Sequence, residues 1–327
     1  MDVCKICSNA EGNTPYSVRE MQLGLRDRFR YFQCGVCGCL QIAAIPYDMR
    51  KYYPATYFSF RDYSRLAHAQ LRAKLDKWRV KHALGKGLPS WLSRLVKPLD
   101  YISWLKTAGL GVDAKILDVG CGSGKLLLRM KLGGLSHCEG ADPYLENEIR
   151  YPNGLIIHKS DFRNLQKQWD FIMFHHSFEH MADPFAVLGA AAKQLTTNGA
   201  ILIRVPLADS VAWERYRENW YNLDAPRHFF LHTEISIQKL AEQSGLEVFH
   251  HFRDATAAQF SMSELYARDV AGNAGVKPET LIDRGTLNRF RHESKLYNRE
   301  GRGDCGGFFL HRRAPTTPTL LPSTPAA

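Results

Sequence analysis

The sequence of 327 residues contains no long uncharged apolar run. A membrane-spanning helix needs about 18 or more consecutive apolar residues, and no stretch here reaches that length. The first residues, Met1 to Cys7, contain no apolar run of the length found in secretory signal peptides. With 45% hydrophobic and 23% charged residues, the composition predicts a soluble globular protein in a reducing, cytoplasmic compartment.

Cysteine is scarce beyond the N-terminus, because five of the eight cysteines lie within the first 39 positions. They include two C-x-x-C pairs, Cys4 with Cys7 and Cys34 with Cys37. Paired knuckles of this kind are typical of a zinc ion held by four thiolates, a closed and therefore structural site. We predict a zinc ribbon over residues 1–45, with Cys39 either a substitute ligand or, as we favour, a spare thiol.

Two common phosphate-binding motifs are also absent. The segment 115–128 has the pattern of a short buried strand, a glycine loop and a helix. The third glycine of G-x-G-x-x-G would fall on Lys125, and the first glycine and final hydroxyl residue of a P-loop would fall on Val119 and Leu126. The loop does contain three glycines, Gly120, Gly122 and Gly124. They let the backbone approach a ligand at a helix N-terminus, which predicts a nucleotide-type cofactor site.

Asp118 followed by these alternating glycines resembles the first motif of class I S-adenosylmethionine-dependent methyltransferases. Asp142 ends a second expected strand, 18 residues after Gly124, where a carboxylate can accept hydrogen bonds from ribose hydroxyls. By the same resemblance, Asp161 faces the adenine amino group and Phe162 packs near the ring. Each acidic residue taken singly is equally well explained as a helix cap or turn former, but their order favours a cofactor site. The resemblance implies cofactor binding by Asp118, Gly120, Gly122, Gly124, Asp142, Asp161 and Phe162.

Strands alternate with helices over the same region, which predicts an α/β fold with a parallel sheet. The expected strands cover residues 116–119, 136–141, 154–158, 169–174, 198–206, 246–252 and 303–311. We predict a doubly wound, seven-stranded, Rossmann-like methyltransferase sheet over residues 113–313, with a helical insert at about 257–300. A basic helical connector or lid, 46–112, joins it to the zinc ribbon, and residues 314–327 are expected to form a disordered tail.

A histidine-rich segment follows the fourth expected strand, at the sheet edge where open α/β folds bind ligands. Histidine can remove a proton from an oxygen or carbon acceptor because its unperturbed pKa is near 6.5. We expect His176 or His180 to act as a base, with Glu179 as the orienting carboxylate. The Glu-His stretch also resembles one that holds a divalent ion in quinone-type O-methyltransferases, where a glutamate replaces His176. An alternative is that Glu179 and His180 only cap the next helix and line the cofactor pocket.

A long aromatic and charged loop, residues 213–232, follows the fifth expected strand. Such loops over a rigid sheet commonly carry substrate-binding groups. Aromatic faces can stack on a sugar or aromatic ring, a carboxylate can accept hydrogen bonds from hydroxyls, and a basic pair can hold a phosphate or carboxylate. The candidate acceptor-binding residues are Trp220, Tyr221, Asp224, Arg227 and His228. The alternative is a hydrophobic patch with a stabilising salt bridge.

Acidic residues are scarce between Arg61 and Lys106, where eleven Lys or Arg and three Asp give +8 of the chain's net charge of +10. Leu71, Leu75 and Trp78 recur there at helical spacing, with basic residues on the other faces. Three interpretations compete. The favoured one is a solvated helix over the cofactor cleft, the second is contact with an anionic membrane surface or carrier, and nucleic acid is the least favoured.

Together, the zinc ribbon, the glycine loop, the sequence Phe-Glu-His at 178–180 and the sequence Pro-Arg-His at 226–228 resemble bacterial methyltransferases of sugars or polysaccharide precursors. The resemblance implies O- or C-methylation of a small, saccharide-linked acceptor with S-adenosylmethionine, and a structural Zn²⁺. The alternative function is a zinc-ribbon scaffold with a non-catalytic methyltransferase-like domain that contacts nucleic acid or an anionic surface. The acceptor, the metal need of the histidine cluster and the oligomeric state stay open.

Overall fold

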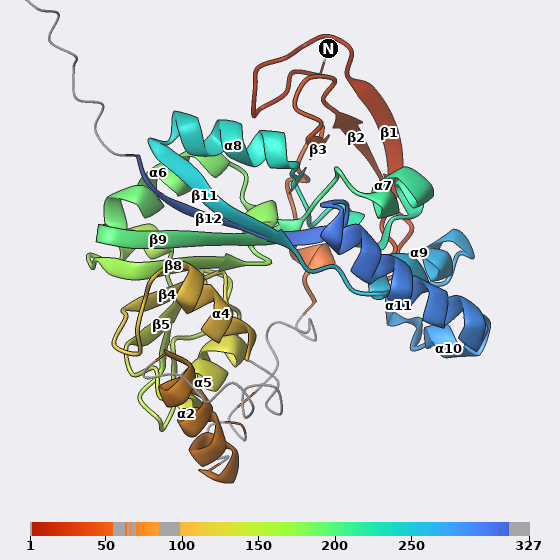
Figure 1. Ribbon diagram of the computed structural model, residues 1–327. Helices are drawn as coiled ribbons and strands as arrows, with labels where there is room; N and C mark the ends of the chain where they lie inside the picture. Colours follow the sequence, from red (N-terminus) through yellow and green to blue (C-terminus); the bar gives the residue numbers. More distant parts are fainter. Residues whose placement is uncertain (1, 55–62, 64–65, 67–69, 85–98, 314–327) are drawn as a thin grey trace, which may run out of the picture.

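The computed structural model describes residues 2–54, 63, 66, 70–84 and 99–313. They form a large sheet with helices on both faces, a small sheet near the N-terminus, and a helical insert that projects from one end of the large sheet (Figure 1). The predicted tail and part of the basic connector lie outside the described residues.

The large sheet has the strand order β11-β12-β9-β8-β4-β5-β7-β6. Its strands are β4 (Ile116–Val119), β5 (Cys138–Ala141), β6 (Ile149–Arg150), β7 (Ile156–His158), β8 (Trp169–His175), β9 (Leu195–Pro206), β11 (Leu246–Arg253) and β12 (Cys305–Arg312). The five central strands are parallel, whereas β6, β11 and β12 pair antiparallel with their neighbours. The chain winds outward from β4 to β7 and then returns to the other side of β4. The carboxyl ends of β4 and β8 therefore form a topological switch point, where open α/β sheets bind ligands.

The predicted α/β class and doubly wound sheet are confirmed by this topology. All seven expected strands are present, and β6 is an eighth, antiparallel strand at the outer edge. It has no signal in the sequence, because two residues are too few to show an alternating pattern.

Two hydrophobic cores lie on opposite faces of the sheet, because successive strand residues point to opposite sides. On one face Ile116, Phe171 and Met173 pack against α2 (Gln70–Leu84), α4 (Asp100–Thr107) and α5 (Lys125–Leu132). On the other, Leu117 and Phe174 pack with residues of α6 (Pro184–Gln194) and α8 (Glu234–Gln243). Figure 1 shows these two helical layers on either side of the sheet. The central strands are thus buried on both faces, which fixes their positions at the switch point.

The remaining helical elements cluster near the carboxyl ends of the strands. They are η1 (Arg50–Tyr52), η3 (Phe162–Asn164), η4 (Phe178–His180), α7 (Val211–Tyr216), η5 (Arg217–Asn219), η6 (Tyr221–Leu223), α9 (Ala258–Ala267), η7 (Gly272–Ala274), α10 (Pro278–Leu281) and α11 (Arg284–Arg299). The helices α9, α10 and α11 form the insert between β11 and β12. None of the helices among the described residues combines the length and apolar character needed to cross a bilayer.

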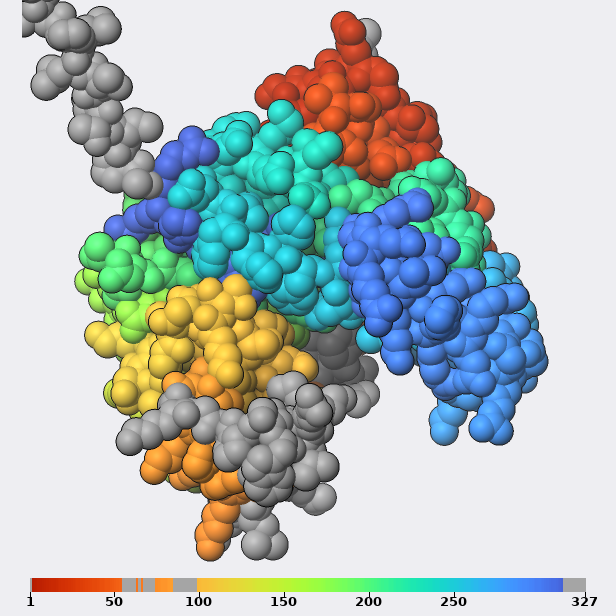
Figure 2. All heavy atoms as spheres, in the orientation of Figure 1, coloured from red at the N-terminus to blue at the C-terminus, as the bar shows by residue number. Residues whose placement is uncertain are grey.

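The small sheet joins the N-terminal unit, residues 2–45, to the loop at residues 213–232, which is called the acceptor loop below. The strands β1 (Thr14–Arg19) and β2 (Arg28–Gln33) form an antiparallel hairpin, and β3 (Leu40–Ile42) continues the sheet. A fourth strand, β10 (Phe230–Leu231), comes from the loop at 213–232 and pairs with β3. In Figure 2 the N-terminal unit packs directly on the green and cyan segments that include this loop. The N-terminal unit therefore packs against the acceptor loop and supports it.

Helix α2 presents a different face from the one that its apolar spacing predicts. Leu75 is 55% exposed and Trp78 is 37% exposed, whereas Asp76 and Val80 are buried. Val80 meets the C-cap of α5, where a Cβ on Gly133 would lie 3.0 Å from Val80 Cγ2. The small side chain of Val80 fits this close approach, whereas Leu75 and Trp78 face outward.

Candidate functional site

A cavity of about 1100 Å³ opens at the carboxyl ends of β4, β5, β8 and β9. Among the described residues its lining includes eight carboxylates: Asp100, Asp118, Asp142, Asp161, Asp183, Asp224, Asp254 and Glu179. Four cationic side chains also line it: Lys125, Arg129, Arg163 and Arg204. The described part of the lining is thus acidic, although the whole chain carries a net charge of +10. An acidic lining favours cationic ligands over anionic ones.

Gly120 follows β4 directly and lines the cavity with bare backbone. Its φ is 71°, and its N–H donates to the carbonyl of Ala141 at 2.8 Å. A Cβ at this position would lie 2.6 Å from the Cβ of Ser177, whose hydroxyl donates to the Val119 carbonyl at 2.5 Å. Both the left-handed backbone and the close approach of Ser177 therefore require glycine.

Gly122 and Gly124 also have positive φ, but they do not line the cavity. Gly124 is the N-cap of α5, where a Cβ would lie 2.5 Å from Ile157 Cδ1. The N–H of Gly122 donates to Asp142 Oδ2 at 2.8 Å. These two glycines therefore shape the turn and position Asp142.

The carboxylates of Asp118 and Asp142 lie on neighbouring strands at the cavity wall. Asp142 also accepts a hydrogen bond from the N–H of Tyr144 at 2.9 Å, and burial raises its pKa despite the two backbone donors. Asp118 is buried, its Oδ1 has no hydrogen-bond partner among the described residues, and burial raises its pKa well above the usual value. An unsatisfied buried carboxyl beside a cavity is costly, so this wall fits a ligand that brings hydrogen-bond donors.

Asp161 and Phe162 form the next part of the cavity wall. The carboxylate of Asp161 caps η3 by accepting from the Arg163 N–H at 2.9 Å, and it forms an ion pair with the Arg163 guanidinium. That ion pair lowers the pKa of Asp161, against burial, which raises it. Phe162 is buried and makes an edge contact with Phe174, with ring centroids 5.9 Å apart. The predicted adenine-facing pair thus lines the cavity beside Asp142.

His176 lies just beyond β8 in a left-handed conformation, with φ of 56°. Such backbone is uncommon outside glycine and recurs at functional turns. Its Nε2 contacts the Arg204 guanidinium, and its Nδ1 lies 3.7 Å from Glu179 Oε1. The side chain is 39% exposed and lines the cavity, so it can reach a bound molecule.

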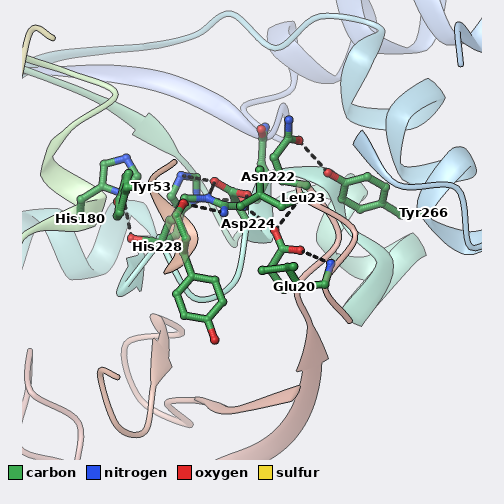
Figure 3. Close-up of polar contacts among 12 residues, drawn as sticks. Glu20, Leu23, Tyr53, His180, Asn222, Asp224, His228 and Tyr266 are labelled. Carbon is green, nitrogen blue, oxygen red and sulfur yellow. Dashed lines mark hydrogen bonds and ion pairs between the residues drawn. The ribbon is translucent and has the colours of Figure 1, made fainter. Parts of the chain in front are cut away.

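Glu179, His180 and His228 form a second cluster, which is named the cavity cluster below. His180 Nδ1 lies 2.8 Å from the Arg227 carbonyl, and His228 Nδ1 lies 2.7 Å from the Asn222 carbonyl. A carbonyl only accepts, so each Nδ1 carries the hydrogen, and each neutral ring keeps a lone pair on Nε2. The two rings are 4.8 Å apart (Figure 3). Burial lowers the pKa of His180, which favours this neutral form.

Three of the five predicted acceptor-binding residues, Tyr221, Asp224 and His228, line the cavity. Trp220 instead is buried, and its indole N–H donates to Asp304 Oδ2 at 2.8 Å.

Arg227 is also buried and lies outside the cavity lining. Its guanidinium pairs with the carboxylates of Asp224 and Glu20, the latter at 3.0 Å. It holds the N-terminal unit against the loop. The prediction that Arg227 binds the acceptor placed its side chain in the cavity, but the side chain does not extend there.

Several residues that line the cavity were not predicted from the sequence. Tyr53, from the connector, places its hydroxyl 3.3 Å from His180 Nδ1. Arg204 lies near the carboxyl end of β9 and forms an ion pair of 2.8 Å with Asp254. Arg204 interrupts the apolar run of β9. A charged residue in a strand that should be buried on both faces is a signal in the sequence for a functional position. Asp254 and Tyr53 have no comparable signal.

The four predicted cysteine ligands converge in the N-terminal unit, and are named the sulfur cluster below. Cys4 Sγ lies 3.6 Å from Cys37 Sγ, and Cys7 Sγ lies 3.5 Å from Cys34 Sγ. All four sulfurs lie within 4.8 Å of one another. Sulfurs bound at about 2.3 Å to one tetrahedral zinc ion are about 3.8 Å apart, so the spacing fits zinc. Cys39 is buried outside this cluster.

The fold and the cavity define an α/β protein with a glycine-loop ligand site at its switch point. Residues 86–251 match a family described as "Methyltransferase domain". The match spans just over half of the chain, and the chain belongs to this family.

No curated protein matches the chain. Among solved structures, mycolic acid cyclopropane synthase CmaA1, complexed with SAH and CTAB, shares 16% identity at a TM-score of 0.42, covering 77% of this chain and 99% of that one. The plantazolicin methyltransferase BpumL shares 16% identity at a TM-score of 0.40, covering 80% and 93%. The cyclopropane synthase MmaA2 from Mycobacterium tuberculosis shares 16% at 0.39, covering 64% and 83%.

Proposed function

We propose that this methyltransferase-family chain uses S-adenosylmethionine to methylate a small, saccharide-linked acceptor at oxygen or carbon. The observation that supports the cofactor most strongly is the wall formed by Gly120, Asp118 and Asp142, where bare backbone adjoins a carboxyl with an unsatisfied oxygen. When bound, S-adenosylmethionine supplies a methyl group that is activated by the positive sulfonium. The acidic lining of the cavity suits such a cation.

The chain's own groups have separate roles in this proposal. Asp142 accepts hydrogen bonds from the ribose, and Asp118 accepts one from the amino group of the methionine part. Asp161 and Phe162 hold the adenine. The residues proposed for the cofactor thus occupy the part of the cavity next to β4 and β5, which leaves the part next to β8 and β9 for an acceptor.

Methyl transfer to a hydroxyl or an acidic carbon releases a proton, which the protein must accept. His176 and His180 both line the cavity, and we propose one of them as that base, with Glu179 as the orienting carboxylate. The Nε2 lone pair of His180 and the left-handed backbone of His176 support this assignment.

A saccharide acceptor is supported by aromatic faces next to carboxylates at the acceptor side. The ring of Tyr53 makes an edge contact with the ring of His180, with centroids 6.4 Å apart. Tyr221 and Asp224 line the same cavity. Apolar sugar faces pack on aromatic rings while their hydroxyls donate to carboxylates. We further propose that the sulfur cluster holds a structural Zn²⁺.

Calorimetric titration of the zinc-loaded chain with S-adenosylmethionine tests the cofactor. We expect one binding event per chain, weakened at least about tenfold in Asp142→Asn because a charged acceptor is lost. Asp113→Asn, at an exposed position, is the control and should bind like the wild type. Mass spectrometry of sugar nucleotides and glycan fragments should then show the gain of one methyl group. A folded, zinc-loaded chain that gives no binding heat would favour the scaffold alternative.

A further inference from the structure

We propose that the cavity cluster of Glu179, His180 and His228 is a binding site for a divalent first-row transition-metal ion, which faces an oxygen atom of the acceptor. The role toward the acceptor rests on the proposed methyltransferase function, whereas binding of the ion does not. The three residues come from η4 and from the acceptor loop, so the site forms only in the folded chain.

The ligand atoms already lie close to the separation that one ion requires. One oxygen of Glu179 and one nitrogen from each histidine lie within 4.8 Å of one another, and His228 Nε2 is 3.9 Å from Glu179 Oε1. Two atoms bound at about 2.1 Å to a single ion are about 3.0–3.4 Å apart. The ligand atoms thus lie at most about 1.8 Å further apart than one ion requires, a difference that rotations of the side chains can close.

The histidines are oriented as metal ligands usually are. In metal sites the ring nitrogen that does not bind the ion donates to a carbonyl or carboxylate, which fixes the tautomer and the ring. Here His180 and His228 both donate Nδ1–H to backbone carbonyls, those of Arg227 and Asn222. A role in capping a helix would explain one such histidine. Here two histidines are fixed in the same way, and both have Nε2 available for a ligand.

The surroundings of the Glu179 carboxylate independently support a bound cation. Its side chain is 1% exposed, and neither carboxylate oxygen has a hydrogen-bond partner among the described residues. The nearest imidazole nitrogens, of His176 and His228, lie 3.7 and 3.9 Å away, beyond hydrogen-bond range. Burying a carboxylate without hydrogen bonds is unfavourable, and a cation at the cluster removes that cost.

The donor set also indicates the kind of ion and its task. Two imidazole nitrogens and one carboxylate suit Mn²⁺, Fe²⁺, Co²⁺, Ni²⁺ or Zn²⁺. Three protein ligands leave coordination positions for other molecules, as in catalytic sites, and here the cluster lines the cavity. An acceptor hydroxyl or carbonyl oxygen fits those positions. A bound ion would occupy the Nε2 lone pair of His180, so His180 could not then act as the base. That role would fall to His176, whose Nε2 contacts Arg204.

Titration of the zinc-loaded full chain with Mn²⁺, followed by the electron paramagnetic resonance of free Mn²⁺, tests the site. Mn²⁺ prefers oxygen and nitrogen ligands to thiolates, so it does not report on the sulfur cluster. We expect one Mn²⁺ per chain, with affinity at least about tenfold weaker in Glu179→Gln and in His228→Ala. His251→Ala is the matched control, because His251 lies 3.8 Å from Glu234 in an exposed His–Glu pair outside the cavity.

The possible outcomes separate this inference from the proposed function. Glu179→Gln keeps the side-chain volume, and normal binding of S-adenosylmethionine by that variant shows that it is folded. Mn²⁺ binding that fails up to about 1 mM in the wild type, or that persists unchanged in both variants, overturns the metal site even if methyl transfer is detected. Mn²⁺ binding without binding of S-adenosylmethionine would instead contradict the proposed function and leave the metal site standing.

Discussion

The sulfur cluster and the cavity cluster, the two groups of side chains proposed to bind metal ions, have opposite designs. The sulfur cluster has four ligands in two local C-x-x-C pairs, and three of its four cysteines are buried. The cavity cluster has three ligands from two distant segments, and it faces the large cavity. Four ligands complete a tetrahedral site, whereas three leave room for a further molecule. We therefore expect the first cluster to serve folding and the second to serve chemistry.

The two clusters are connected through the acceptor loop. The hydroxyl of Thr233 donates to the Cys37 carbonyl at 2.5 Å, and the hydroxyl of Tyr31 donates to the His228 carbonyl at 2.9 Å. Pairing of β3 with β10 lies between these two contacts. These contacts predict that the cavity cluster depends on the N-terminal unit, whereas the four ligands of the sulfur cluster all come from that unit itself. This dependence in one direction can be tested.

The largest effect is expected from Cys37→Ser, which removes one thiolate. Structural zinc sites contribute on the order of 10 kcal/mol to folding, so β1, β2 and β3 should lose their order with the zinc. Mn²⁺ binding at the cavity cluster should be lost as well. Zinc content, hydrogen exchange and Mn²⁺ resonance measure the three effects, and Cys39→Ala, outside the cluster, should change none of them. A Cys37→Ser chain that still binds Mn²⁺ would show that the clusters are independent.

A smaller effect is expected from His232, which is buried between the cavity and the N-terminal unit. Its ring lies next to Phe178 and Phe230, and burial lowers its pKa to about 4. The unfolded chain takes up a proton below about pH 6.5 and the native ring does not, so this stability is present above pH 6.5 and is lost as the pH falls toward 4. The loss between pH 7 and pH 5 is about 2 kcal/mol.

His232→Phe should remove this pH dependence and keep the ring contacts. Urea unfolding of the wild type and the variant at pH 7 and pH 5 measures it, with His137→Phe at an exposed position as the control. Acid also weakens thiolate coordination, but that effect is common to all three proteins. An equal loss of stability in wild type and His232→Phe would refute the assignment.

The sulfur cluster was also the easier of the two to predict from the sequence. Its ligands are local pairs, and Asp118 with the glycine loop is likewise a pattern within a few residues. Asp142 follows at the end of the next strand. The buried strands showed the apolar runs that parallel sheets require. Local spacing was therefore enough for the α/β fold, for the position of the cavity and for the cysteines.

The cavity cluster could be predicted only in part, because its partners are set by tertiary structure. His180 and Glu179 were expected to act together, but His228 lies 48 residues further on and was assigned to the acceptor. Arg227 was expected to hold an anionic ligand, yet its partner Glu20 lies 207 residues away in the sequence. Such pairs leave no periodic signal. The inward face of α2 was missed for a similar reason, since it depends on Gly133 of another helix.

The smallest effect is expected from Tyr31→Phe, which deletes only the hydroxyl that donates to the His228 carbonyl. A buried hydrogen bond of this kind contributes about 1 kcal/mol to stability. If it also holds His228 in place, affinity for Mn²⁺ should fall by about three- to tenfold without loss of zinc. Tyr47→Phe, at a fully exposed position, is the control. Reduced stability with unchanged Mn²⁺ affinity would show that the N-terminal unit supports the loop through β3 and β10 alone, and that His228 is positioned by the Asn222 carbonyl on its other side.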